Sequence, residues 1–375
     1  MIKKVSKSNY NVTKKVIISV ITSFSALILI LGIIATVVTG LKPCLYTKCH
    51  PLATCINHAF YGECVCLPGY GGNGKDHCDE CGVTFFQQNA SLVPGRAVPF
   101  SWPATAHMQF TYTDFERFEN FSTAISYGNI CAGVLINRKT VLITASCFKT
   151  SFQYYDSRLR KYFTVNIAPN EFYPDLNAAI HFYFGIDRYV YYDQDLEYVF
   201  QSGISKIIKH PYYNEQTFEN DIAIVKLRHE IQLTKQIQIA CLPNQTSSTY
   251  PDLDMKNAFI AGFSTSGSTF GSWNLQNAEL DLYNSSMCND VKPNNTKNWD
   301  KQFCAGEYEP FSNTTGFCHG DYGSAVYTYD YVNQKQKFVA SGLLSYDVPC
   351  STIHSPAVFT RLAYYLDWIK SHSSY

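Results

Sequence analysis

Residues 220–225 are Asn-Asp-Ile-Ala-Ile-Val: two polar, turn-forming residues followed by a run of apolar and β-branched residues. Similar short runs occur at 141–143 (Val-Leu-Ile) and 338–340 (Phe-Val-Ala). Short runs of β-branched and aromatic residues separated by turn residues are typical of an all-β barrel or sandwich. The final stretch, from Leu362 to Ile369, has helical spacing. The pattern therefore predicts an all-β fold that ends in one helix.

The composition limits the class of protein. The 375 residues contain 30 Lys and Arg against 30 Asp and Glu, and this balance argues against binding of nucleic acid, which needs a basic face. With 46% apolar and 16% charged residues, the chain is expected to be ordered, and its length allows two or three domains. Its 14 cysteines predict metal sites in the cytosol but seven disulfides outside it.

The N-terminal segment decides between these compartments. Residues 1–15 contain five lysines and no acidic residue, and the 23 residues from Val16 to Val38 carry no charge. A helix needs about 20 apolar residues to cross a bilayer, whereas the apolar region of a signal peptide usually has about 7–15, and a buried core helix is rarely uncharged all round. Lysines before the span and a lone Lys42 after it predict a cytosolic N-terminus.

We therefore expect a cytosolic tail at 1–15 and a type II signal-anchor at 16–38, with the C-terminal ectodomain outside the cytosol at the plasma membrane or another secretory-pathway membrane. Six Asn-X-Ser/Thr sequons after the span agree with an exported chain and are candidate glycosylation sites. They begin at Asn89, Asn120, Asn244, Asn284, Asn294 and Asn313. A seventh sequon, at Asn11, falls on the predicted cytosolic side.

Six cysteines lie within 35 residues after the span, at Cys44, Cys49, Cys55, Cys64, Cys66 and Cys78. So short a segment cannot bury an adequate core and needs covalent links, for which spacing alone allows 15 pairings. A zinc site is the alternative, and export of the chain argues against it.

The order of these cysteines, with the turn Pro68-Gly69-Tyr70, resembles an EGF-like module at 44–78. The resemblance implies the disulfides Cys44–Cys55, Cys49–Cys64 and Cys66–Cys78. Residues 41–43 lack the acidic side chains that precede the first cysteine in calcium-binding modules. We therefore expect no calcium site, and no metal or other cofactor is expected elsewhere. The module is expected to serve as a spacer or a protein-contact surface.

Residues 92–375 resemble the trypsin/chymotrypsin-like serine protease family (S1) over nearly their whole length. The matching motifs are Ala97-Val98-Pro99, Ser101-Trp102-Pro103, Cys131-Ala132-Gly133, Asn220-Asp221-Ile222-Ala223, Ala240-Cys241-Leu242-Pro243, Phe303-Cys304-Ala305-Gly306, Cys318-His319-Gly320-Asp321, and Val358-Phe359-Thr360-Arg361 before Asp367-Trp368-Ile369. The resemblance implies two six-stranded β-barrels and a C-terminal helix. It also implies the disulfides Cys81–Cys241, Cys131–Cys147, Cys288–Cys304 and Cys318–Cys350. The first of these would tether the linker at 79–91 to the protease-like domain. The anchor, module and domain together resemble the architecture of type II transmembrane serine proteases.

Catalysis in this family needs a serine nucleophile, a histidine base and an aspartate that orients the base. The base position falls at Ser146 in Thr144-Ala145-Ser146-Cys147, and the nucleophile position falls at Tyr322 in Gly320-Asp321-Tyr322-Gly323. A serine hydroxyl has no basicity near neutral pH, and a tyrosine phenol has a pKa near 10. Asp221 alone of the triad is retained, and Ser345 matches a position that hydrogen-bonds this aspartate in the family.

The positions that match the specificity pocket are also altered. They are Gly316, Phe317, His319, Gly320, Ser345, Tyr346, Asp347 and Ala357. Asp347 and Ala357 replace wall residues that are usually glycine, so we expect no open slot for a basic side chain. The junction at 89–95 has no basic residue before it and contains Pro94, which predicts that no activation cleavage occurs.

We therefore interpret the chain as a non-catalytic serine-protease homologue that binds an unidentified extracellular protein, as a receptor, adhesion protein or regulator of proteases. The tyrosine-rich segment 151–200 is the leading candidate for the contact surface, because loop tyrosines are enriched at interfaces; the whole chain is, however, rich in tyrosine. One alternative is an active type II transmembrane serine endopeptidase. A second is a secreted pseudoprotease released after cleavage.

Overall fold

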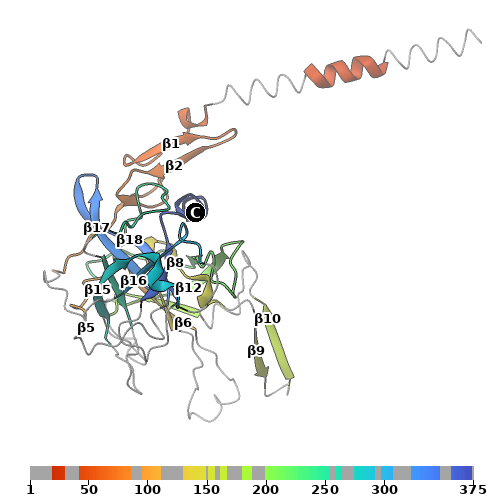
Figure 1. Cartoon of the computed structure of the whole chain (residues 1–375). Helices are drawn as coiled ribbons and strands as arrows, with labels where there is room; N and C mark the ends of the chain where they lie inside the picture. The colour runs from red at the N-terminus through yellow and green to blue at the C-terminus, as the bar shows by residue number, and fades with distance from the viewer. Residues whose placement is uncertain are drawn as a thin grey trace, which may run out of the picture. The chain divides into compact units, whose positions relative to one another are not determined.

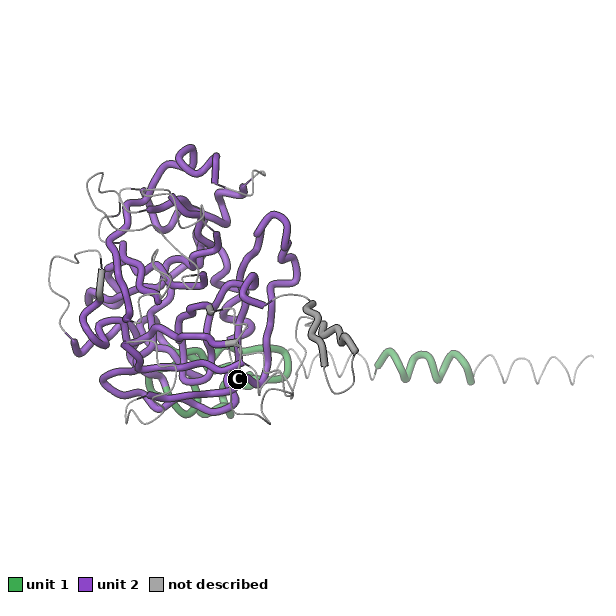
Figure 2. The backbone as a smooth tube through the Cα atoms, turned by 90° about the horizontal axis from the view of Figure 1, so that it is seen from below, with its two compact units in different colours: residues 1–66, 74–77 green, residues 67–73, 78–375 purple. Residues whose placement is uncertain are grey.

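The computed structural model describes residues 19–29, 42–86, 95–110, 130–148, 151–156, 161–166, 180–187, 199–253, 255, 258–263, 274–291, 297–306, 322–346 and 356–373. The chain divides into two compact units (Figure 2). The first comprises residues 1–66 and 74–77, and the second comprises 67–73 and 78–375. This division falls inside the segment predicted to be one EGF-like module.

The first unit contains a helix at residues 19–29, whose large apolar side chains are exposed. In the part of the chain that the structure describes, no helix is both long enough and apolar enough to cross a membrane. Residues 16–18 and 30–38, the two ends of the predicted span, lie outside the described residues.

The cysteine-rich part of the first unit has almost no core. A 3-10 helix, η1 (Pro43–Leu45), precedes the antiparallel strands β1 (Ala53–Asn57) and β2 (Gly62–Cys66), and neither strand contains a buried residue. Two disulfides, Cys44–Cys55 and Cys49–Cys64, link these elements. Covalent links therefore do here what apolar burial does in a larger domain.

The larger unit begins with two short paired strands, β3 (Tyr70–Gly71) and β4 (Asp79–Glu80). The disulfide Cys81–Cys241 holds the segment that follows. Glycine is required at 71, because a Cβ atom there would lie 2.6 Å from the Ile136 carbonyl oxygen.

Two ion pairs also hold this segment. The Arg138 guanidinium donates from Nε and Nη2 to the two carboxylate oxygens of Asp79 at 2.8 and 2.7 Å. The Lys337 ammonium donates to Glu80 Oε1. Because Arg138 and Lys337 belong to different β-barrels, β4 is connected to both.

Two antiparallel barrels of six strands each form the body of the larger unit (Figure 1). The first closes in the order β11-β12-β13-β8-β7-β6. Its strands are β6 (Thr105–Phe110), β7 (Ile130–Asn137), β8 (Thr140–Ile143), β11 (Ile180–Phe184), β12 (Phe200–Lys209) and β13 (Ala223–Leu227).

The second barrel has the order β14-β17-β18-β19-β16-β15, closed by pairing of β14 with β15, and the short strand β5 (Gly95–Arg96) is added beside β15. Its strands are β14 (Ala258–Gly262), β15 (Gln276–Tyr283), β16 (Gln302–Gly306), β17 (Ala325–Val332), β18 (Lys335–Tyr346) and β19 (Ala357–Arg361). The predicted double barrel is confirmed.

Both faces of the central strands are buried. In β8, Val141 and Ile143 pack inside the first barrel, whereas Leu142 packs in an apolar cluster to which both barrels contribute. In β14, Phe259 belongs to this shared cluster and Ile260 to the interior of the second barrel. A strand that is buried on both faces needs a continuous apolar run, which explains why these segments do not alternate.

The last described element is the helix α2 (Leu366–Ser373), which buries Leu366 and confirms a helix near the C-terminus. Its predicted start was wrong: residues 362–365 form turns, so the helix begins four residues later than Leu362. The last helical carbonyl, that of Ser373, accepts a hydrogen bond from Lys226 Nζ on β13 at 2.6 Å. A cation at a helix C-terminus is favourable, because the exposed carbonyls carry partial negative charge. The contact fastens α2 to the first barrel.

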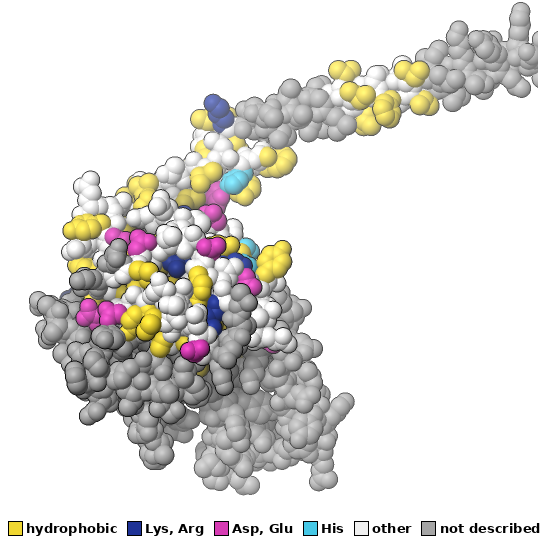
Figure 3. Space-filling model, viewed as in Figure 1, with side chains coloured by type: hydrophobic (Ala, Val, Ile, Leu, Met, Phe, Trp, Pro, Cys, Tyr) yellow, Lys and Arg dark blue, Asp and Glu magenta, His cyan; other side chains and the backbone are white. Residues whose placement is uncertain are grey.

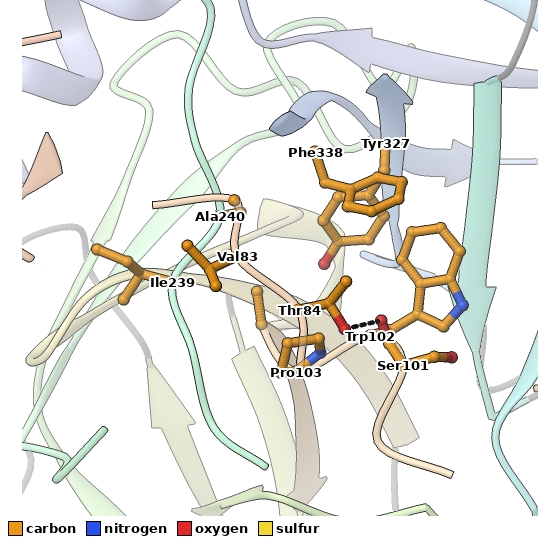
Figure 4. Close-up of a pocket in the computed structure, with 11 residues that line it drawn as sticks. Val83, Thr84, Ser101, Trp102, Pro103, Ile239, Ala240, Tyr327 and Phe338 are labelled. Atoms are coloured by element: carbon orange, nitrogen blue, oxygen red, sulfur yellow. Dashed lines mark hydrogen bonds between the residues drawn. The ribbon is translucent and has the colours of Figure 1, made fainter. Parts of the chain in front are cut away.

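A cavity of about 20 Å³ lies in the larger unit between the linker and the barrels, among Trp102, Tyr327 and Phe338 (Figure 4). At its edge, Thr84 Oγ1 donates to the Ser101 carbonyl oxygen at 3.3 Å. A water molecule needs a cavity volume of about 10–15 Å³ on the same measure. The cavity can therefore hold a single water molecule but no larger ligand.

We predict that the contact between Asp79 and Arg138 stabilises the larger unit. A double-mutant cycle with Asp79→Ala and Arg138→Ala, read by thermal or denaturant unfolding, should give a coupling energy of about 1 kcal/mol, because the pair is bidentate and half-buried. The control is Lys335→Ala, whose ammonium is exposed and 3.6 Å from Glu80, and it should change stability by less than about 0.5 kcal/mol. A coupling energy near zero would contradict the prediction.

Candidate functional site

The buried carboxylate of Asp221 is the centre of the candidate site. Asp221 lies two residues before the first residue of β13, Ala223, and is 1% exposed. Its Oδ1 accepts a hydrogen bond from the Ser146 backbone N at 2.7 Å. Its Oδ2 accepts from Ser146 Oγ at 2.9 Å and from Ser345 Oγ at 2.5 Å. Both carboxylate oxygens are therefore satisfied by neutral donors.

Both barrels contribute these donors. Ser146 lies in the 3-10 helix η3 (Ala145–Cys147) that follows β8, where the disulfide Cys131–Cys147 fixes the chain. Ser345 lies on β18 in the second barrel. Thr360, on β19, donates from Oγ1 to the Asp221 carbonyl oxygen at 2.8 Å. The site thus lies where the two barrels meet.

Burial controls the ionisation of Asp221. Loss of hydration raises its pKa to about 6, and hydrogen bonds from Ser345, from Ser146 and from the Ala145 backbone oppose this rise. The carboxylate carries its charge at neutral pH, surrounded by hydrogen-bond donors from both barrels.

Tyr322 lies in the turn before β17 and is half-buried, packed against the apolar interiors of both barrels. Its carbonyl oxygen accepts from the Ala132 backbone N at 2.8 Å. The next residue, Gly323, has φ +81°, and a Cβ atom there would lie 2.1 Å from the Ala132 carbonyl oxygen. Because only glycine fits, the backbone of this turn is held tightly against β7.

Three of the residues matched to the specificity pocket are described, and all three are buried: Ser345, Tyr346 and Ala357. The Tyr346 ring lies 5.2 Å from the ring of Phe218, a residue with φ +55°. The remaining pocket positions, Gly316, Phe317, His319, Gly320 and Asp347, lie outside the described residues. Residues 89–94 of the predicted uncleaved junction do so as well.

Five predicted disulfide pairings are present in the structure: Cys44–Cys55, Cys49–Cys64, Cys81–Cys241, Cys131–Cys147 and Cys288–Cys304. Cys66 and Cys78 are each disulfide-bonded. Cys318 and Cys350 lie outside the described residues. No cluster of three or more metal-ligating side chains occurs in the described ranges.

Two of the predicted glycosylation sites are described, and both asparagines are exposed. Asn244 follows the Cys241-Leu242-Pro243 segment. Asn284 caps the 3-10 helix η5 (Ser285–Cys288) by accepting a hydrogen bond from the Ser286 backbone N at 3.1 Å. The other sites, Asn89, Asn120, Asn294 and Asn313, lie outside the described residues.

The sequence did not identify two residues that act on the site. Thr360 belongs to a family motif, but its bond to the Asp221 carbonyl is visible only in the fold. Lys209 is buried at the end of β12 and donates to the Phe148 carbonyl oxygen. Burial lowers the pKa of Lys209, and the charges of Glu215 and Asp221 oppose this shift. The sequence offered one indication that this lysine is buried, since it directly follows two isoleucines.

Two barrels, a C-terminal helix and a buried aspartate between the barrels define the trypsin-like class of protein. The trypsin family model matches residues 101–369, and the chain belongs to this family.

Melanization protease 1 of Drosophila melanogaster is 32% identical over 173 residues, which are 45% of this chain and 42% of that protein. Transmembrane protease serine 11G of Mus musculus is 27% identical over 173 residues, 46% of this chain and 39% of that protein. Chymotrypsin-C of Bos taurus is 25% identical over 302 residues, 78% of this chain and 94% of that protein. The match thus spans less than half of the first two relatives and nearly all of the third.

Asp221→Asn is predicted to remove a pH dependence of stability between about pH 4 and 6. The native carboxyl holds its proton up to about pH 6, whereas the ordinary pKa is 3.8. The native state therefore binds more protons in this window, and the free energy of unfolding of the wild type falls as pH rises, by up to about 3 kcal/mol. Asparagine carries no such proton.

The measurement is the difference in unfolding free energy between wild type and Asp221→Asn at several pH values from 4 to 7. Asp281→Asn, a change on the exposed side of β15, is the control for general effects of removing a charge. A difference that stays constant across the window would show that Asp221 does not titrate there.

Proposed function

We propose that the chain is a membrane-anchored, extracellular serine-protease homologue without catalytic activity, which acts by binding a protein partner. One observation carries the proposal. The side chain at the base position, Ser146, is a hydroxyl that donates a hydrogen bond to Asp221 Oδ2 at 2.9 Å. Family members need a group there that accepts a proton from the nucleophile and returns it to the leaving amine. An aliphatic hydroxyl does neither near neutral pH.

The nucleophile position supports the same conclusion. Tyr322 occupies it, in a turn whose backbone is held at Ala132 and Gly323. A phenol oxygen lies several bonds further from its Cα than a serine oxygen, so it cannot occupy the same point. Loss of the nucleophile or base in a comparable enzyme lowers kcat about a million-fold, about 8 kcal/mol, and the two losses are not additive.

Family membership favours the alternative of an active endopeptidase, because catalysis is the usual activity of trypsin-like domains. An oxyanion hole alone supplies about a thousand to ten thousand times the rate in water. That residual rate is far below the rate of a complete triad. We therefore favour a scaffold that presents its surface over an enzyme.

The activity test uses the full chain purified in detergent. A generic serine-reactive acylating or phosphonylating probe should give no covalent labelling, and peptides with basic or large apolar residues before the scissile bond should not be cleaved. Labelling or turnover that Tyr322→Phe abolishes would overturn the proposal and favour the active endopeptidase.

The matched variant restores both residues, as Ser146→His with Tyr322→Ser. We expect it to remain inactive, because the wall positions of the pocket and the activation junction have also changed. Efficient cleavage after arginine by this variant would show that the interpretation of the pocket is wrong. Trypsin assayed beside it is the positive control for the probe and the peptides.

Two observations support the membrane anchor. Residues 16–38 carry no charge, and the described part, 19–29, is helical with exposed apolar side chains. One relative is itself named a transmembrane protease. The disulfides Cys44–Cys55 and Cys49–Cys64 support an EGF-like module between anchor and domain.

The anchor predicts the distribution of glycans. In mammalian cells the full chain should stay in the membrane fraction after alkaline carbonate extraction and carry glycans at Asn244 and Asn284. Thr246→Ala and Ser286→Ala each remove one sequon while keeping the asparagine, so each should increase gel mobility by one glycan. Thr13→Ala, which removes the sequon at Asn11, should change nothing. A glycan at Asn11, or release of the chain into the medium, would contradict this topology; release would favour the secreted alternative.

The proposed partner needs a contact surface on the chain. The tyrosine-rich segment contributes an antiparallel hairpin, β9 (Ser151–Asp156) with β10 (Lys161–Asn166), which forms a sheet of its own. Its register places Tyr155 opposite Tyr162. We propose that this hairpin is part of the contact surface, since aromatic residues are enriched at protein interfaces.

A further inference from the structure

The cysteine-rich part of the first unit exposes five large apolar side chains. Leu45, Tyr46, Ile56, Phe60 and Tyr61 are 73%, 85%, 46%, 77% and 59% exposed. These are all of the exposed large hydrophobic residues among the described residues of 42–66 and 74–77. Figure 3 shows apolar side chains on the solvent-facing surface of this part of the chain. Ile56 alternates with Cys55 and Asn57, which both contact Cys44, so it points to the other side of β1. We call the remaining four residues the apolar face: Leu45, Tyr46, Phe60 and Tyr61.

Short-range contacts bring the apolar face together at one end of the β1–β2 hairpin. The last strand pair before the hairpin loop is Asn57 with Gly62. The Cys44 backbone N donates to Asn57 Oδ1 at 2.9 Å, and a Cβ at Gly62 would lie 2.5 Å from Thr47 Oγ1. The 3-10 helix that carries Leu45 therefore lies against the hairpin end that carries Phe60 and Tyr61.

The hairpin loop has a defined conformation. The His58 backbone N donates to the Tyr61 carbonyl oxygen at 2.9 Å, and the two rings stack with centroids 4.6 Å apart. His58 Nε2 also lies 2.7 Å from Glu63 Oε2. The loop thus presents its aromatic side chains on a fixed backbone, so their exposure is a property of the fold.

The position of the apolar face in the sequence indicates what covers it. Leu45 follows the last residue of the proposed anchor, Val38, by seven residues, a distance of at most about 25 Å even for a fully extended chain. Tyrosine and other aromatic residues are enriched at the boundary between acyl chains and headgroups. Lys42 and Lys48, both exposed, flank Leu45 and Tyr46 in the sequence and suit the phosphates of the headgroups.

We infer that the apolar face lies in the headgroup region of the bilayer that holds the anchor. The inference rests on the proposed anchor and deepens it. The module is then seated on the membrane through Tyr46, Phe60 and Tyr61 rather than acting as a free spacer. A protein or a second copy of the chain as the occupant is an alternative that the experiment distinguishes.

The first measurement uses the unmodified full chain in phosphatidylcholine nanodiscs, probed by hydroxyl-radical oxidation and mass spectrometry. Two pairs of tyrosines are matched in exposure: Tyr46 with Tyr212, at 85% and 78%, and Tyr61 with Tyr331, at 59% and 62%. Tyr46 and Tyr61 should be oxidised several-fold more slowly than their partners in the larger unit. Equal rates within both pairs would overturn the inference.

The second measurement identifies what gives the protection. A photo-crosslinking phenylalanine analogue replaces Tyr46, Phe60 or, as a control, Tyr212 in the full chain, in nanodiscs that contain an alkyne-tagged phosphatidylcholine. Positions 46 and 60 should acquire the tag and position 212 should not. Crosslinks to a second copy of the chain or to another protein, without the tag, would overturn the inference.

A third position separates this inference from the proposed function. The same analogue at Leu27, inside the proposed anchor, should also acquire the lipid tag. Tagging at 27 without tagging at 46 and 60 overturns the seating of the module and leaves the anchor intact. Failure at 27, together with release by alkaline carbonate, overturns the anchor and this inference with it.

Discussion

The burial of one carboxylate, that of Asp221, constrains the arrangement of the larger unit. A charge removed from water needs donors close by, because an unpaired buried ion costs several kcal/mol. Ser146 supplies two donors from the first barrel, and Ser345 supplies one from the second. Separation of the barrels would break the hydrogen bond that Ser345 donates to this carboxylate. Apolar packing between the barrels is non-directional, whereas hydrogen bonds have a preferred geometry. The polar contacts at Asp221 therefore add a directional constraint to the apolar packing between the barrels.

The class of the fold could be predicted from the sequence pattern, but the pairing of the strands could not. This difference has a physical cause. Runs such as Val141-Leu142-Ile143 are apolar throughout because alternate residues fill the barrel interior and the shared cluster. Such a run identifies a strand buried on both faces, but it contains no information about which strands pair. A barrel and a sandwich look alike at that level. The family motifs supplied the topology, and the register shift between Ile204 and Lys206 could be seen only in the structure.

The candidate site shows a similar division. Ser146, Asp221 and Ser345 could be named in advance because the family resemblance matches each to a position in or near the triad, and the structure places both serines within hydrogen-bonding distance of Asp221. The bond of Thr360 to the Asp221 carbonyl, and that of Lys209 to the Phe148 carbonyl, depend on how β19 and β12 are placed in space. No spacing along the chain encodes those contacts. A local sequence pattern therefore cannot predict which residues from other parts of the chain contact a motif.

Folding and catalysis make different demands on position 146. Folding requires a donor that reaches the Asp221 carboxylate, and the short Ser146 side chain meets this requirement directly at 2.9 Å. Catalysis requires a ring that reaches past the carboxylate to a nucleophile and changes its protonation state during the reaction. If position 146 is that of the base, as we propose, a hydroxyl meets the first requirement and not the second. An intact Asp221 network is therefore explained by the cost of leaving a buried charge unpaired, and its presence alone does not indicate proteolytic activity.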